Sequence, residues 1–180
     1  MEQTTPFNKF ATPVRMGFII SLVKIIISTI GYQFFAGNWG MNILFMLLGL
    51  GVMIGMFIQT GKAQRKAMGG YLDIKQAFQA IFVASLIVCV VTGIYDIIYV
   101  KYINPEMMEK VKEATIASME KWGAPQDTID KTVQKFDEQS ADKLNIGKQL
   151  LGWLYSIIFY GILSFICAAV VKKNKQADVA

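Results

Sequence analysis

The chain has 180 residues, of which 54% are hydrophobic and 17% are charged, and its formal net charge is +5. A soluble domain usually carries about 25% charged residues, so this composition is typical of a membrane protein. The length favours one domain over residues 1–180. Because the chain has no histidine, it lacks the commonest general base and the commonest metal ligand. The two cysteines, Cys89 and Cys167, lie in apolar segments, so we expect neither a disulfide framework nor a metal site.

Four segments are long and apolar enough to cross a bilayer, which takes roughly 20 helical residues for a core of about 30 Å. They are residues 14–35, 41–59, 77–100 and 150–171. The first could instead be a cleaved secretory signal, but the stretch YQFFAGNWG lacks a small-x-small pattern, which favours an uncleaved anchor. The sequence therefore predicts an all-α integral membrane protein, built as a bundle of four transmembrane helices.

The loop charges predict how this bundle is oriented, because positive loops stay in the cytoplasm. Lysine and arginine dominate before the first segment, between the second and third segments, and after the fourth. By contrast, residues 36–40 carry no charge, and residues 101–149 carry eight lysines against nine acids. We therefore expect both termini in the cytoplasm of a bacterial inner membrane and residues 101–149 outside it. Tyrosine and tryptophan favour membrane interfaces and mark the predicted outer boundary at Tyr32, Trp39, Tyr95, Tyr99, Tyr102, Trp153 and Tyr155.

Residues 101–149 are expected to form a helical hairpin between the third and fourth spans. Asn104 can cap a helix whose first residue is Pro105, and Gly123 is a natural stop before Pro125 starts a second helix. Apolar residues recur with helical spacing at Met108, Val111, Met119 and Trp122, and again at Ile129, Val133 and Phe136. The hairpin could be a solvated connector, or it could bind a partner or a ligand. Its paired carboxylates are interpreted as solvated charge.

Small and polar residues follow a heptad-like spacing on two of the apolar segments. They are Gly17, Ser21, Lys24, Ser28 and Gly31 in the first segment, and Ser85, Cys89, Thr92, Asp96 and Tyr99 in the third. The second segment contains the pair Gly51 and Gly55. Small residues let membrane helices approach closely, so we interpret these positions as helix-packing faces. The first and third segments run in the same direction and could face each other.

Lys24 and Asp96 are charged residues inside predicted spans, where charges are costly and are functional candidates. Lys24 lies about ten residues into the first segment and Asp96 about nineteen into the third. The offset of about nine residues corresponds to roughly 13 Å at helical rise, too far for direct contact unless the two helices are strongly staggered. Lys24 is expected to snorkel inwards or to bond to serine or backbone groups. Asp96 is expected to accept hydrogen bonds from tyrosine, Gln33 or water, and an ion-coupling role for either residue is the alternative.

The stretch RKAMGGYLDIKQAF at residues 65–78, together with YINPEMMEK at residues 102–110, resembles the bacterial family called Domain of Unknown Function 4199. The matching positions are Gly69, Gly70, Tyr71, Ile74, Gln76, Ala77, Phe78, Asn104 and Pro105. Asp73 departs from the serine that the family tends to have. The resemblance covers essentially the whole chain. It implies four spans in a Bacteroidetes-type cytoplasmic membrane, no established activity, and an accessory role in envelope or polyprenyl-linked glycan assembly.

The loop before the third segment has two physical interpretations. Gly69 and Gly70 allow a sharp turn back into the membrane, and this turn could be the loop's whole purpose. Alternatively, the loop forms a cytoplasmic surface that contacts a partner or anionic lipid headgroups. That surface would comprise Lys62, Arg65, Lys66, Tyr71 and Lys75.

Taken as a whole, the residues favour a non-enzymatic accessory or scaffold subunit of a membrane complex. It would bind a protein partner through its intramembrane helix faces, the basic loop or the outer hairpin. The alternative is a small transporter or flippase subunit that uses Lys24 and Asp96. We expect membrane lipids and either a membrane protein or a second copy as partners, and neither nucleic acid nor a cofactor.

Overall fold

A computed structural model describes residues 10–35, 38–142 and 146–173 of the chain, with side chains outside residues 139–150. The described residues form six α-helices and one π-helical turn. These are α1 (Ala11–Phe34), α2 (Trp39–Ala67), α3 (Ile74–Ile98), η1 (Tyr99–Ile103), α4 (Met107–Lys121), α5 (Gln126–Asp142) and α6 (Ile146–Val171). The prediction of an all-helical fold is therefore confirmed.

Four of these elements are long and apolar enough to cross a membrane: α1, α2, α3 continued by η1, and α6. They correspond to the four predicted segments, so the chain is a multi-pass membrane protein. α2 is longer than expected, because it continues past Gln59 to Ala67. The added residues include alanine, glutamine, arginine and lysine, which are strong helix formers. Gly61 and Gln64 are buried there, so packing also stabilises the extension.

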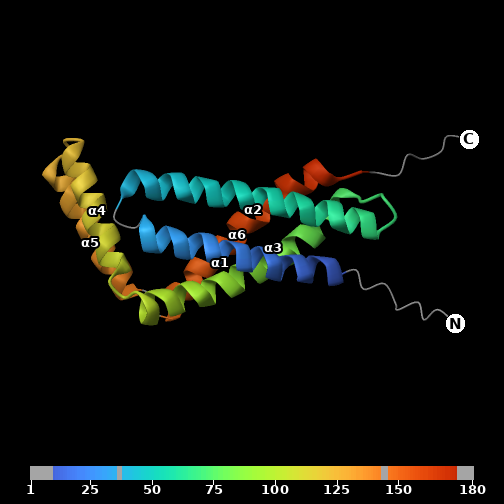
Figure 1. The fold of residues 1–180 in the computed structure, drawn as a ribbon, viewed down its shortest axis with the longest axis horizontal. Helices are drawn as coiled ribbons and strands as arrows, with labels where there is room; N and C mark the ends of the chain where they lie inside the picture. The colour runs from blue at the N-terminus through green and yellow to red at the C-terminus, as the bar shows by residue number, and fades with distance from the viewer. Residues whose placement is uncertain (1–9, 36–37, 143–145, 174–180) are drawn as a thin grey trace, which may run out of the picture.

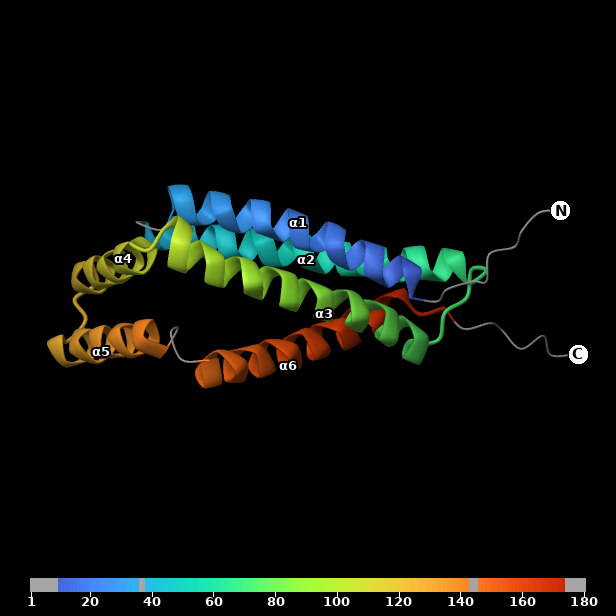
Figure 2. The same ribbon diagram turned by 90° about the horizontal axis from the view of Figure 1, so that it is seen from below.

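The four long helices do not form a symmetric bundle. α3 is central and packs on α1, α2 and α6, while α1 also packs on α2. α6 crosses α3 and diverges from α2 toward its own first residues (Figures 1 and 2).

The two ends of the bundle carry different elements (Figure 1). The start of α1, the turn between α2 and α3, and the end of α6 lie together at one end, called here the terminal end. The end of α1, the start of α2 and the helices α4 and α5 lie at the other, called the hairpin end. This grouping agrees with the predicted clustering of the basic segments, whereas the side of the membrane that each end faces stays a prediction.

Close helix approach depends on a few small residues in the core. A Cβ atom on Gly17 of α1 would lie 3.0 Å from the carbonyl oxygen of Ala84 and 2.9 Å from Cβ of Ile87, both in α3. One on Gly61 of α2 would lie 2.5 Å from Cγ2 of Val171 in α6. Large side chains such as Phe57 fill the remaining core. Many other large apolar side chains face outward, as lipid-facing residues do.

The hairpin contacts the hairpin end of the bundle through α4 and the residue that follows it. Met107 of α4 is buried with Tyr99, and Trp122 meets Trp39 of α2 edge to face, with ring centroids 4.5 Å apart. Lys112 of α4 bonds to Asp137 of α5 at 2.8 Å, and this hydrogen bond raises the pKa of Lys112. α4 ends at Lys121, and the short connection to α5 turns at Gly123, whose φ is +70°, close to the stop that the sequence predicts.

The predicted start of the hairpin is wrong in one respect. α4 begins at Met107, and no side chain caps it. Asn104 instead ends the π-helical turn, where its N–H donates to the carbonyl of Tyr99 at 2.8 Å. The backbone N–H of Met107 then donates to the Asn104 carbonyl at 3.2 Å. Asn104 and Pro105 therefore form a turn between the span and α4 rather than the first turn of α4.

Candidate functional site

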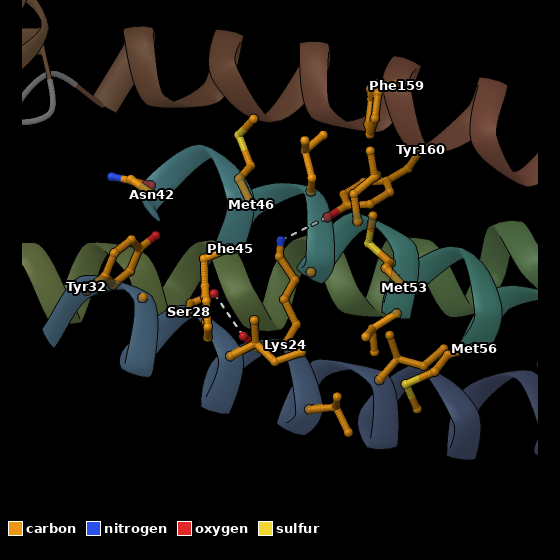
Figure 3. A pocket seen from close by; sticks show the side chains of 18 residues that line it. Lys24, Ser28, Tyr32, Asn42, Phe45, Met46, Met53, Met56, Phe159 and Tyr160 are labelled. Carbon is orange, nitrogen blue, oxygen red and sulfur yellow. Dashed lines mark hydrogen bonds between the residues drawn. The ribbon is translucent and has the colours of Figure 1, made fainter. Parts of the chain in front are cut away.

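Lys24 reaches across the bundle from α1 to two other helices. Its ammonium donates to Oγ1 of Thr92 in α3 at 3.1 Å and to Oη of Tyr160 in α6 at 2.9 Å. The Nζ atom also lies 5.6 Å from the centre of the Tyr160 ring (Figure 3). Lys24 was expected to snorkel inwards or to bond to serine or backbone groups. Its amine is instead held inside the bundle by the hydroxyls of a threonine and a tyrosine.

Asp96 lies in a cluster of tyrosines near the hairpin end. Tyr32 of α1 donates to Oδ1 of Asp96 at 3.4 Å, and Tyr99 donates to Gln33 at 3.3 Å. The rings of Tyr32 and Tyr99 are 5.1 Å apart, and those of Tyr95 and Tyr99 are 5.7 Å apart. The prediction that a tyrosine donates to Asp96 is confirmed. Gln33 belongs to the same cluster but bonds to Tyr99.

Lys24 and Asp96 line one cleft, although the sequence placed them roughly 13 Å apart along the helix axes. The bond from Lys24 to Thr92 brings the amine to within one helical turn of Asp96, which is about 6 Å along α3. This cleft, called here the polar cleft, has a volume of about 220 Å³. It is lined by Lys24, Cys89, Thr92, Gly93, Asp96, Ile97, Trp153, Ser156 and Tyr160.

A second, larger space lies on the other side of Lys24. This apolar groove has a volume of about 550 Å³. It is lined by α1 between Ile20 and Tyr32, by α2 between Asn42 and Met56, and by Phe159 and Tyr160 of α6 (Figure 3). Lys24 and Tyr160 line both spaces. The pair therefore forms the boundary between a polar cleft and an apolar groove.

Tyr160 is the member of this site that the sequence interpretation missed. Tyrosine normally sits at a membrane interface, yet Tyr160 lies in the middle of α6 and is only 6% exposed. Its position deep in an apolar segment is the signal that could have singled it out. The sequence placed Thr92 on a helix-packing face. Thr92 is buried, and its hydroxyl also accepts a hydrogen bond from Lys24.

The basic loop at the terminal end has a fixed shape. Gly69 and Gly70 have φ values of +81° and +94°, so they make the sharp turn that the sequence predicts. Leu72 then exchanges two backbone hydrogen bonds with Lys173, of 2.9 and 2.8 Å. Arg65 donates to the carbonyl of Val171 at 3.1 Å. The loop is therefore tied to the end of α6.

Asp73 caps α3 at the start of the third span. Its carboxylate accepts from the N–H of Gln76 at 2.7 Å, and the Gln76 side chain accepts from the N–H of Asp73 at 3.2 Å. This reciprocal capping box satisfies two donors at the helix start. The departure from serine at this position therefore preserves the capping function.

The remaining residues of the predicted basic surface differ in exposure. Lys62, Lys66 and Lys75 are exposed, and Tyr71 is exposed with its ring 5.9 Å from Nζ of Lys173. Arg65 is half-buried by its contact with α6. Four of the five residues therefore present a basic and aromatic surface, and Arg65 supports it from beneath.

Some of the predicted helix-packing residues are buried between helices, and others are not. Gly17, Ser21, Ser85 and Cys89 are buried, and Ser164 of α6 donates to Ser85 at 3.3 Å. Gly31 faces Phe45 of α2 rather than α3, and Ser28 lines the apolar groove. For the second-segment pair the interpretation as a packing face is wrong within this chain, because a Cβ atom at Gly51 or Gly55 would meet nothing within 4 Å.

Comparisons with known proteins identify one relationship. No curated protein and no solved structure matches the chain. A family model described as "Protein of unknown function (DUF4199)" matches residues 15–173, which include most of α1 and all of the other helices. The chain therefore belongs to the family called Domain of Unknown Function 4199.

Proposed function

We propose that this protein is a non-enzymatic accessory subunit of a bacterial inner-membrane complex, with its terminal end in the cytoplasm. The partner contacts the surface formed by Lys62, Arg65, Lys66, Tyr71 and Lys75. The observation that carries this proposal is the bridge between Leu72 and Lys173. It gives a loop that faces the aqueous phase a defined shape.

The defined shape matters because membrane topology alone requires only positive charge near the ends of the spans. A loop that merely sets orientation needs no hydrogen bonds to a distant part of the chain. Here the Leu72–Lys173 bridge and the Arg65–Val171 bond tie the loop to α6. A loop that is ordered in advance loses less conformational entropy when a partner binds.

The charge on this surface indicates the chemistry of the partner. At the opposite end of the bundle, lysines of α4 and α5 form ion pairs with acidic residues of these helices and with Glu106 just before α4. The exposed Lys62, Lys66 and Lys75 have none of these pairings. Complementary charge speeds association and selects among partners, so we expect an acidic cytoplasmic surface on the partner. An envelope or polyprenyl-linked glycan assembly complex is the context that the family suggests.

Cross-linking in native membranes tests the proposal. A photoreactive residue placed at Lys66 is expected to capture one discrete protein, and adding Lys62→Glu and Lys75→Glu should remove that product. A photoreactive residue at Lys131, an exposed lysine of α5, is the matched control and should not capture it. Absence of any Lys66-specific product, or the same product with the charge reversals, contradicts the proposal.

A second candidate function is supported by the shared polar cleft. Intramembrane ionisable residues that face a cavity commonly mark ion or substrate pathways, and Lys24 and Asp96 line one such cleft. A transporter or flippase subunit would use both. In proteoliposomes containing a pH-sensitive dye, Lys24→Met and Asp96→Asn should then each abolish the proton flux of the wild-type protein. This candidate function is contradicted if both variants keep the proton flux of the wild-type protein, or if the wild-type protein gives no more proton flux than protein-free vesicles.

A further inference from the structure

The helices α4 and α5 run across the direction of the four long helices (Figure 1). We propose that α4 lies in the headgroup layer of the membrane and that the lipid surface is its binding partner. Tyr102 and Ile103 before its start and Trp122 at its end are the side chains that enter the lipid. The accessory role proposed above uses the terminal end of the bundle, so either proposal can hold without the other.

The start of α4 is fixed at the level where the third span ends. Met107, the first residue of α4, is buried together with Tyr99 of the π-helical turn. Tyr102 and Ile103 belong to the same turn but face outward, and they are 70% and 58% exposed. Ile98, at the end of α3, is also exposed. The exposed surface at the start of α4 therefore continues the lipid-facing surface of the third span.

The other end of α4 is fixed at the level where α2 begins. Trp122 follows the last residue of α4 and meets Trp39, the first residue of α2, edge to face. Trp122 is still 61% exposed, so most of its surface is open to another contact. The exposed apolar side chains of Met41 and Leu44 follow Trp39 on α2. Here too, the exposed surface beside α4 continues the lipid-facing surface of a span.

The distribution of charge along α2 gives the depth of these contacts. Lys62 is the first charged residue of α2, and the helix rises about 35 Å from Trp39 to Lys62 at 1.5 Å per residue. The hydrocarbon core is about 30 Å thick, and the bilayer with its headgroups is about 40–45 Å thick. With Lys62 in one headgroup layer, Trp39 and Trp122 lie in the other. Tryptophan and tyrosine favour this layer because each combines an apolar ring with a polar atom that reaches water.

The two faces of α4 match this placement. Met107 and Val111 pack in the same buried cluster on the side of the bundle, whereas Glu109 and Glu113 are exposed. Glu113 precedes Trp122 by about two and a half turns at 3.6 residues per turn, so the two side chains leave α4 in opposite directions. An interfacial helix has this arrangement, with one side in the lipid boundary and a charged side in water.

The charge of the hairpin indicates which part of the lipid it recognises. Residues 101–149 carry eight lysines against nine acids. Anionic lipids attract segments with an excess of positive charge, and this segment has none. The contact therefore depends on aromatic and apolar side chains, and a zwitterionic lipid such as phosphatidylcholine serves as well as an anionic one.

Fluorescence of the full-length protein in phosphatidylcholine bilayers tests the proposal. Trp39→Phe and Trp153→Phe together leave Trp122 as the only tryptophan of the chain. Lipids brominated near the headgroup end of the acyl chain should quench Trp122 about twofold, as expected for a ring at interfacial depth. Lipids brominated at the end of the acyl chain should quench it less. Adding anionic phosphatidylglycerol should leave the quenching unchanged.

The matched control places the only tryptophan on the opposite face of α4. Glu113→Trp, made in a chain whose three natural tryptophans are replaced by phenylalanine, should be quenched by aqueous iodide and not by the brominated lipids. If a background variant does not fold, the difference in quenching between the wild-type protein and Trp122→Phe measures Trp122 instead. Three outcomes overturn the proposal: quenching of Trp122 by iodide but not by lipid, equal lipid quenching on the two faces, or quenching that requires anionic lipid.

Discussion

The small residues of α1 and those of α2 follow similar spacing but differ in burial. Gly17 and Ser21 of α1 are buried, and Gly17 lies so close to α3 that a Cβ atom would be 3.0 Å from the backbone of Ala84. Gly51 and Gly55 of α2 are exposed, and a Cβ atom at either position would meet nothing within 4 Å. The close approach of α2 to α6 depends instead on Gly61.

The comparison shows why small-residue spacing is weak evidence of where two membrane helices meet. Lipid is as apolar as leucine, so no hydrophobic force selects which face of such a helix turns inward. Shape and polar contacts therefore determine which face of the helix turns inward. On α1 the same face carries Lys24 and Ser21, and Lys24 bonds to α3 and α6. On α2 the buried face is marked by Phe57 and Thr60, whereas Gly51 and Gly55 lie on an exposed face.

Gly17→Leu is expected to have the largest effect on stability. The new side chain would have to separate α1 from α3, because its Cβ meets backbone and a branched side chain at 3.0 and 2.9 Å. Overpacking a core typically costs about 1–3 kcal/mol, and this position should reach the upper end or prevent folding. Unfolding in mixed micelles measures the loss.

Gly51→Leu is the control for that experiment, because it makes the same chemical change on an exposed face. If Gly17→Leu and Gly51→Leu lose similar free energies of unfolding, close approach at Gly17 is not what stabilises the pairing of α1 and α3. The distinction between the two helices would then be lost.

Gly61→Ala is expected to cost about 2 kcal/mol, since a single methyl group would lie 2.5 Å from Cγ2 of Val171. The matched variant is Gly49→Ala, whose methyl group would make an ordinary contact of 3.4 Å with Ile27. That variant should change the free energy of unfolding by less than about 0.5 kcal/mol. If the two variants lose the same free energy of unfolding, α2 and α6 can move apart at Gly61 without a stability cost.

Lys24→Met is expected to leave stability unchanged or to raise it by about 1 kcal/mol, although Lys24 shares the buried face of α1. Replacing a buried charge by an apolar side chain of similar length is often neutral or stabilising. Thr92 keeps a partner, because its hydroxyl also donates to the carbonyl of Val88 at 2.8 Å. A loss of more than about 2 kcal/mol in the free energy of unfolding would instead make Lys24 a structural residue.

The four spans, the hairpin and the grouping of the ends could be predicted because each depends on local sequence. Length and apolar composition identify a span, and glycine at positions such as Gly70 and Gly123 identifies a turn. The α1–α3 pairing was also accessible, because both helices carry small residues on one face and run in the same direction.

The position of Lys24 relative to Asp96 could not be predicted, because it depends on how helices are staggered and on how far a lysine side chain extends. Counting residues from the start of each span assumes that the spans begin at one level. In the structure Lys24 instead meets Thr92, one turn before Asp96. The polar cleft further requires Tyr160 from α6, and the sequence contains no local signal for the angle at which α6 crosses α3.

Gly51→Leu combined with Gly55→Leu is expected to have the smallest effect. In the single chain nothing lies within 4 Å of either position, so the free energy of unfolding should change by less than about 0.5 kcal/mol, as for most exposed substitutions. The mass of the protein in mild detergent, measured by light scattering, should also be unchanged. A shift from a larger to a smaller assembly would show that this face of α2 joins two copies. The spacing of Gly51 and Gly55 would then have predicted a real interface that one chain cannot form alone.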